Sequence, residues 1–230
     1  MFKAEAIVWD LDGTLVDSAP DLATALNIVL DMRGFANHSL ETIRGMIGNG
    51  VPKLIERGFN AIGMRLEAEQ LEQLIPIFVK VYAECATEQT RPYPQIVETL
   101  DQLRAMNIPM GVCTNKPEAL SRQILDDLGL SKYFSSVIGG DTTSTRKPDP
   151  QPLLRCLQEL VTEPQAGMLI GDSAVDVGAA RAAGVEVGVV PWGYRSVPVE
   201  NLGADFILED LTELPKLIHI GTKQIRQVAH

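Results

Sequence analysis

The chain has 230 residues, of which 45% are hydrophobic and 22% are charged, so it can bury one globular core and carry a smaller insert. Its net charge of −10 and its lack of any basic run argue against a partner bound through a nucleic-acid backbone. No stretch of about 18 apolar residues predicts a membrane span, and early charges interrupt any signal-peptide core. We therefore expect no membrane partner and a cytoplasmic location.

The cysteines give no sign of a disulfide framework or of a metal site. Cys85, Cys113 and Cys156 are widely separated, and none belongs to a C-x-x-C pair. Such residues are typical of buried thiols in a reducing compartment. We expect a monomer or a homodimer.

The first predicted element is a short buried strand over Ala6–Trp9, which ends at an Asp-Leu-Asp-Gly turn. After it, Ser18-Ala-Pro-Asp21 resembles a helix-capping box with proline in the first turn. Apolar residues then recur at helical spacing, most clearly over residues 71–82. We therefore expect residues 16–88 to form an all-helical insert.

From residue 89 onward, helical patterns alternate with short apolar runs, which is typical of a parallel sheet. The predicted strands are Met110–Cys113, Val137–Ile138, Met168–Ile170, and Val185–Gly188 or its continuation to Val190. The predicted fold class is therefore α/β. It consists of a Rossmann-like parallel-sheet core of residues 1–15 and 89–230, with an inserted helical domain of residues 16–88.

Polar side chains follow almost every predicted strand at its carboxyl end, where α/β sheets bind their ligands. Taken singly, each segment has an ordinary explanation as a turn or a helix cap. Taken together, three acidic positions, a hydroxyl and lysines at one sheet edge indicate a catalytic site. The segments are Asp10-Leu-Asp-Gly-Thr14, Thr114-Asn-Lys116, Lys147-Pro-Asp-Pro150 and Gly171-Asp-Ser-Ala-Val-Asp176.

The order D-x-D-G-T, T-N-K, K-P and G-D-S-x-x-D resembles the haloacid dehalogenase superfamily of phosphatases over the whole chain. The helical insert resembles the cap domain of the first subclass of that superfamily. The segments WDLDGTLVDSAPDL, IGNG, TNKP, VIGGD and KPDPQPLL are similar to members that act on 2-phosphoglycolate. The resemblance implies magnesium-dependent hydrolysis of a small phosphorylated metabolite, with 2-phosphoglycolate as the expected substrate.

Phosphate monoesters hydrolyse very slowly in water, and a carboxylate nucleophile divides the reaction into two easier steps. Asp10 is the expected nucleophile, which forms an aspartyl-phosphate as the resemblance implies. Asp12 lies two residues further on, so in an extended segment both carboxylates point to one side. Asp12 is the expected general acid and base.

Crowded carboxylates repel each other and the incoming phosphate, so a divalent cation is required, and Mg²⁺ suits oxygen ligands. The resemblance implies that Asp10, Asp172 and the main-chain carbonyl of Asp12 bind it. Asp176 is expected behind these ligands, where it orients them.

The remaining core residues are expected to hold the phosphate. Thr114 would donate a hydrogen bond to it, Asn115 would shape the same loop, and Lys147 would neutralise the transferring phosphoryl group. Lys116 either faces the substrate or is a solvated loop lysine.

Within the insert, Gly48-Asn49-Gly50 precedes Val51-Pro52-Lys53 and a predicted helix. The free N–H groups of such a helix start attract anions, and we expect this segment to contact the substrate carboxylate. The alternative is a plain turn between two helices. Lys53 either adds charge there or is solvated.

Several other activities remain open. Other small substrates are a sugar phosphate, N-acetylmuramate 6-phosphate, pyrophosphate or a nucleotide. A mutase shares the motifs, and a phosphonoacetaldehyde hydrolase would use a cap lysine such as Lys53. A non-enzymatic phospho-aspartate switch is disfavoured by the chain length and by Asp12, and Asp12 also disfavours a dehalogenase.

Overall fold

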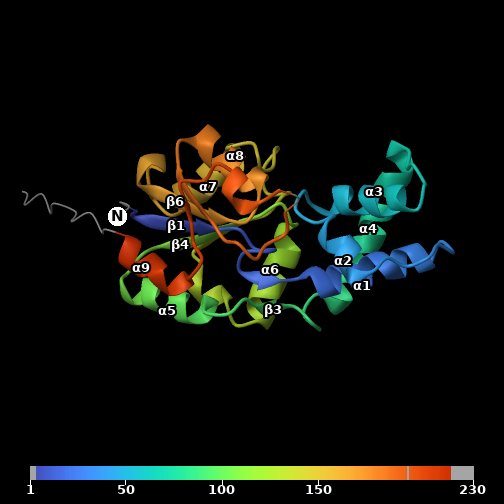
Figure 1. The fold of residues 1–230 in the computed structure, drawn as a ribbon, viewed down its shortest axis with the longest axis horizontal. Coiled ribbons are helices and arrows are strands. Elements are labelled where there is room, and N and C mark those ends of the chain that lie inside the picture. The colour runs from blue at the N-terminus through green and yellow to red at the C-terminus, as the bar shows by residue number, and fades with distance from the viewer. Residues whose placement is uncertain (1–3, 196, 219–230) are drawn as a thin grey trace, which may run out of the picture.

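The computed structural model of the chain describes residues 4–195 and 197–218. Helices cover both faces of a parallel sheet, and a separate group of helices lies at one end of it (Figure 1). The strands of the sheet are β1 (Ala6–Trp9), β4 (Met110–Cys113), β5 (Ser136–Ile138), β6 (Gly167–Gly171), β7 (Glu186–Val189) and β8 (Phe206–Ile207). Their order is β5-β4-β1-β6-β7-β8, which confirms the predicted α/β class.

Strand β1 is apolar along its whole length because both of its faces are covered. Ile7 and Trp9 belong to one hydrophobic cluster, and Ala6 and Val8 belong to the other. The covering helices are α5 (Ile96–Ala105), α6 (Glu118–Asp127) and the short α9 (Leu214–Leu217) on the first face, and α7 (Gln151–Glu159) and α8 (Ala174–Ala183) on the second. The Trp9 side chain therefore packs fully buried in the first of these clusters.

The separate group of helices, which we call the cap, consists of α1 (Ala19–Asp31), α2 (Leu40–Arg44), α3 (Val51–Ala61) and α4 (Ala68–Cys85). Helices α1 and α4 pack side by side, and Leu26, Phe59 and Phe78 are buried among them. Among the described residues, none of the helices combines the length and the apolar composition needed to cross a bilayer. All three cysteines are free and buried, as predicted.

The two connections between core and cap lie side by side. Val16–Asp17 forms a short strand, β2, which pairs antiparallel with Arg91–Pro92, β3, so residues 16–17 are extended where a helix was expected. The buried carboxylate of Asp21 accepts hydrogen bonds from the backbone of Gln89 and from both the backbone and the hydroxyl of Thr90. These bonds join the start of α1 to the end of the cap.

The expected capping box at Ser18 is wrong. Helix α1 does begin after Ser18 with proline in its first turn, but the serine side chain does not cap the helix. Its hydroxyl points to Asp12, and the Asp21 side chain points to the second connection. Both polar groups serve tertiary contacts in place of the local cap.

Candidate active site

The candidate site lies at the carboxyl end of β1, where the strand order changes direction. The chain moves from β1 to β4 on one side and reaches β6 on the other. Trp9 pairs with Val112 of β4 and with Ile170 of β6, so the segments that follow these three strands begin at one level. Such a switch point opens a crevice at the sheet edge.

Asp10 and Lys147 form a buried ion pair at this edge. Nζ of Lys147 lies 2.9 Å from Oδ1 of Asp10 and 2.6 Å from Oδ1 of Asp176. The side chain of Asn115 donates to the main-chain carbonyl of Lys147 at 3.0 Å, which ties the two loops together. One ammonium group therefore serves two carboxylates away from bulk water.

The carboxylates are electrostatically frustrated. The pKa of Asp10 is raised to about 6, because burial and the nearby charges of Asp176 and Asp12 raise it more than Lys147 lowers it. Burial and the charges of Asp176 and Asp10 also hold the pKa of Asp172 well above its usual range. Burial alone would lower the pKa of Lys147, but Asp10 and Asp176 raise it far above its ordinary value. The cluster therefore carries more negative charge than its one lysine can balance.

Asp176 is fully engaged by its surroundings. Its second oxygen accepts from the hydroxyl of Ser173 at 2.6 Å and from the backbone N–H groups of Ser173 and Asp172. These contacts form a capping box at the start of α8, which sets the direction of the Asp172 loop.

Asp172 packs very closely against two glycines. A Cβ atom at Gly13 would lie 2.5 Å from Oδ2 of Asp172, and one at Gly193 would lie 2.2 Å from the same oxygen. The backbone N–H of Tyr194 donates to that oxygen. The Gly in D-x-D-G-T is therefore required by the close approach of Asp172, and its φ of +84° also favours glycine.

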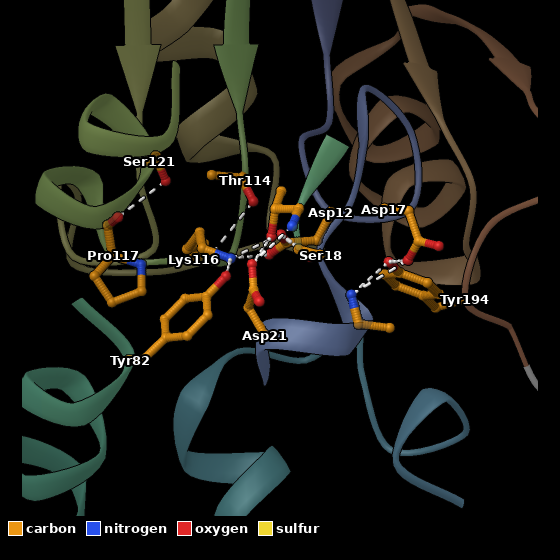
Figure 2. A network of polar contacts seen from close by, with 12 residues as sticks. Asp12, Asp17, Ser18, Asp21, Tyr82, Thr114, Lys116, Pro117, Ser121 and Tyr194 are labelled. Carbon is orange, nitrogen blue, oxygen red and sulfur yellow. Dashed lines mark hydrogen bonds and ion pairs between the residues drawn. The ribbon is translucent and has the colours of Figure 1, made fainter. Parts of the chain in front are cut away.

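Asp12 lies in a second polar group, which reaches the cap through Tyr82 (Figure 2). Its Oδ1 accepts from Ser18 at 2.5 Å, and its two oxygens lie 2.7 and 2.9 Å from Nζ of Lys116. The same ammonium donates to the hydroxyl of Tyr82, in α4 of the cap, at 2.8 Å. Lys116 is buried, so its description as a solvated loop lysine is wrong.

A cavity between core and cap brings most of the predicted residues together. The core lining is Asp10, Asp12, Thr114, Asn115, Lys116 and Lys147. The cap lining is Leu22, Ile47, Gly48, Gly50, Val51, Leu54 and Tyr82.

Two predicted cap residues point elsewhere. The side chain of Asn49 accepts from Arg57 at 2.6 Å and does not line this cavity. Lys53 is exposed and pairs with Glu56 at 2.6 Å, so it faces away from the site.

Sequence reasoning missed three residues of the site: Ser18, Tyr82 and Tyr194. The local pattern predicts that Ser18 caps a helix and that Tyr82 occupies one position of an amphipathic helix. A tyrosine within an apolar stripe was the one available signal, since a buried phenol needs a polar partner. The hydroxyl of Tyr194 donates to Asp17 at 2.6 Å and accepts from the N–H of Ala19, contacts that no local pattern predicts.

Comparison with known proteins defines the class. Residues 7–190 match the haloacid dehalogenase-like hydrolase family, so the chain belongs to that family. The phosphoglycolate phosphatase of Caulobacter vibrioides is 40% identical over 210 residues, which cover 91% of this chain and 89% of that protein. The phosphoglycolate phosphatase of Aquifex aeolicus is 37% identical over 212 residues, which cover 92% and 95%.

Solved structures agree with this class. The crystal structure of a predicted phosphoglycolate phosphatase from Haemophilus somnus has a TM-score of 0.87 and 31% identity, covering 94% of this chain and 98% of that one. The Lactobacillus delbrueckii structure has a TM-score of 0.83 and 26% identity, and the match covers 94% of this chain and 98% of that one. The chain is therefore a phosphatase of the haloacid dehalogenase-like family.

Proposed function

We propose that the chain hydrolyses 2-phosphoglycolate to glycolate and phosphate, with Mg²⁺ and through an aspartyl-phosphate on Asp10. The observation that carries this proposal is the pairing of Asp10 with the buried Lys147 beside a cavity that the cap covers. A buried carboxylate next to one fixed cation is a suitable nucleophile for a phosphoryl group, whose charge the lysine offsets. The names of the relatives suggest the substrate.

The reaction has two halves. In the first, an oxygen of Asp10 bonds to phosphorus, the bond from phosphorus to the glycolate oxygen breaks, and Asp12 gives that oxygen a proton. In the second, a water oxygen bonds to phosphorus, Asp12 takes a proton from the water, and the bond to Asp10 breaks. One water is consumed, and both aspartates return to their starting forms.

Mg²⁺ fits the carboxylates of this site. One ligand atom from each of Asp10, Asp172 and Asp176 lies within 4.8 Å of the others. The raised pKa values of Asp10 and Asp172 reflect burial and crowding with other carboxylates, which a bound cation would relieve. Because Asp176 is already held by Lys147 and Ser173, we assign the metal to Asp10, Asp172 and the carbonyl of Asp12, with Asp176 orienting them. When bound, the ion would neutralise the carboxylates and the phosphate.

We assign the phosphate to Thr114, Asn115 and Lys147, which line the cavity on the core side. Gly48 and Gly50, at the start of α3, line it from the cap, and we assign the substrate carboxylate to their side. We assign only the backbone of Asn49 to the same carboxylate, since its side chain is bound to Arg57.

A panel of phosphorylated metabolites, compared by kcat/KM, tests the proposal. We expect 2-phosphoglycolate to rank above sugar phosphates, N-acetylmuramate 6-phosphate, pyrophosphate and nucleotides. Asp10→Asn should abolish turnover while circular dichroism shows an intact fold. Steady turnover by this variant would contradict the covalent route, and a single stoichiometric phosphorylation of the wild type would indicate a switch.

A further inference from the structure

The cap contributes Tyr82 to the polar group around Asp12, from the last turn of helix α4. Tyr82 is fully buried, and its hydroxyl lies 2.8 Å from Nζ of Lys116 (Figure 2). The Lys116 side chain is 2% exposed, and its ammonium spans both oxygens of Asp12. A chain of contacts therefore runs from the cap through Lys116 to the expected general acid.

The hydroxyl of Tyr82 is a good partner for an ammonium group here. Burial, together with the charges of Asp12 and Asp21, holds the pKa of Tyr82 well above its ordinary value, so the phenol stays neutral. A neutral phenol oxygen accepts a hydrogen bond from the Lys116 ammonium but carries no charge of its own. The ion pair of Lys116 therefore remains with Asp12. Within the described part of the chain, no salt bridge joins Lys116 to any carboxylate besides Asp12.

We propose that Tyr82 is a positioning residue: it fixes Lys116 against Asp12, so that the acid and base is oriented only when the cap lies on the core. This proposal rests on the proposed function, because it assigns Tyr82 a part in the same two proton transfers. A flexible lysine with one partner can swing, whereas Tyr82 and Asp12 together fix its ammonium from two sides. Ser18, in the connection between core and cap, fixes Asp12 from a third direction.

The proposal predicts a dependence on the leaving group. The alkoxide oxygen of glycolate is a poor leaving group that needs a proton from Asp12, whereas 4-nitrophenolate leaves without one. With enzyme in excess, we expect Tyr82→Phe to slow the first turnover of 2-phosphoglycolate about tenfold and that of 4-nitrophenyl phosphate by less than about twofold. KM should stay unchanged.

Two further variants test whether Tyr82 acts through Lys116 and Asp12. Lys116→Gln should give the same leaving-group dependence, and adding Tyr82→Phe to it, or to Asp12→Asn, should cause no further loss. Tyr133→Phe is the matched control, because it removes the hydroxyl of another largely buried tyrosine, which bonds to the exposed Asp101 outside the cavity lining. It should leave both rates unchanged.

Equal losses on both esters would mean that Tyr82 only supports the structure, and additive losses in the double variants would remove the link to Asp12. A raised KM with unchanged kcat would make Tyr82 and Lys116 substrate contacts. Failure of the proposed function is distinguishable, since the wild type itself would then cleave 2-phosphoglycolate no faster than other esters. The variants would in that case be compared on the best alkyl phosphate of the panel.

Discussion

The ammonium group of Lys147 lies 2.9 Å from Oδ1 of Asp10, and both side chains are almost wholly removed from water. Asp10 follows β1, and Lys147 stands in the loop between β5 and α7, so the pair exists only when the sheet is assembled. Because Asp176 shares the same ammonium, loss of Lys147 would leave two buried carboxylates unpaired.

Lys147→Met should therefore harm both activity and stability. We expect kcat to fall about 10²–10³-fold because a fixed cation at the phosphoryl group is lost, and the free energy of unfolding to fall by about 3–5 kcal/mol. Urea unfolding and phosphate release measure the two effects. Lys53→Met is the control, since Lys53 is an exposed cap lysine. A large loss of activity in that control would instead support the Schiff-base chemistry of a phosphonoacetaldehyde hydrolase.

The sequence predicts the place of the core residues in the fold because they lie at strand ends. Asp10, Thr114 and Asp172 each follow an apolar run, and parallel strands bring their carboxyl ends to one edge. The contact of Asp12 with Lys116 was not predictable because it joins residues 104 positions apart, and the contact with Ser18 was hidden because a serine before a helix usually caps it. Local patterns carry no information about such partners.

The sequence did not predict two short strand pairings, β2 with β3 and β7 with β8, for a different reason. Each involves a strand of two residues, which is too short to show alternation. Asp21 was not predictable from local sequence either. An acidic residue in the first helical turn is typical of a helix cap, but the Asp21 carboxylate accepts hydrogen bonds from Thr90. Packing against distant segments decided these cases.

Magnesium should be needed for turnover and should stabilise the fold. We expect chelation to abolish phosphate release, Mg²⁺ to restore it, and Ca²⁺ to inhibit, because Ca²⁺ takes longer bonds and more ligands. In calorimetric titration, Asp172→Asn should lose Mg²⁺ binding, while Asp31→Asn, at an exposed cap position, should retain it. Full activity after exhaustive chelation would refute the metal assignment.

Asp17 predicts a pH-dependent contribution to stability. Burial raises its pKa, but hydrogen bonds from Arg44 and Tyr194 lower it more, so the net pKa lies below the ordinary 3.8. A lowered carboxyl pKa stabilises the fold above pH 3.8, and this contribution disappears as the pH falls through the folded-state value.

Asp17→Asn should therefore cost about 1 kcal/mol at pH 7, a value that allows for the partial exposure of the Asp17–Arg44 pair. The difference from the wild type should shrink as the pH falls below 3.8 and through the lowered folded-state pKa of Asp17. Urea unfolding at pH 7 and over a series of lower pH values measures it, and Glu56→Gln, which breaks an exposed pair, should show no change. A difference that stays constant with pH would mean that the charge of Asp17 is not responsible.

The start of helix α3 allows the last prediction, which concerns recognition of the substrate carboxylate. Gly50 has a φ of +82°, and a Cβ atom there would lie 3.0 Å from the main-chain oxygen of Asn115 in the core. Gly34, also in the cap, has a φ of +76° and open space around it. A substitution strains the backbone at either glycine because both have a positive φ, but of these two only Gly50 lines the cavity.

Gly50→Ala should lower kcat/KM for 2-phosphoglycolate by about tenfold or more, while 2-hydroxyethyl phosphate, which has the same length and a neutral end, should lose much less. The added methyl group would push the free N–H groups of α3 away from the carboxylate position. Gly34→Ala should reduce stability by about 1 kcal/mol from backbone strain alone and leave the preference between the two esters intact. If Gly50→Ala lowers activity on both esters equally, the segment is a turn that only fits the cap to the core. The carboxylate would then have to be recognised by another group that lines the cavity.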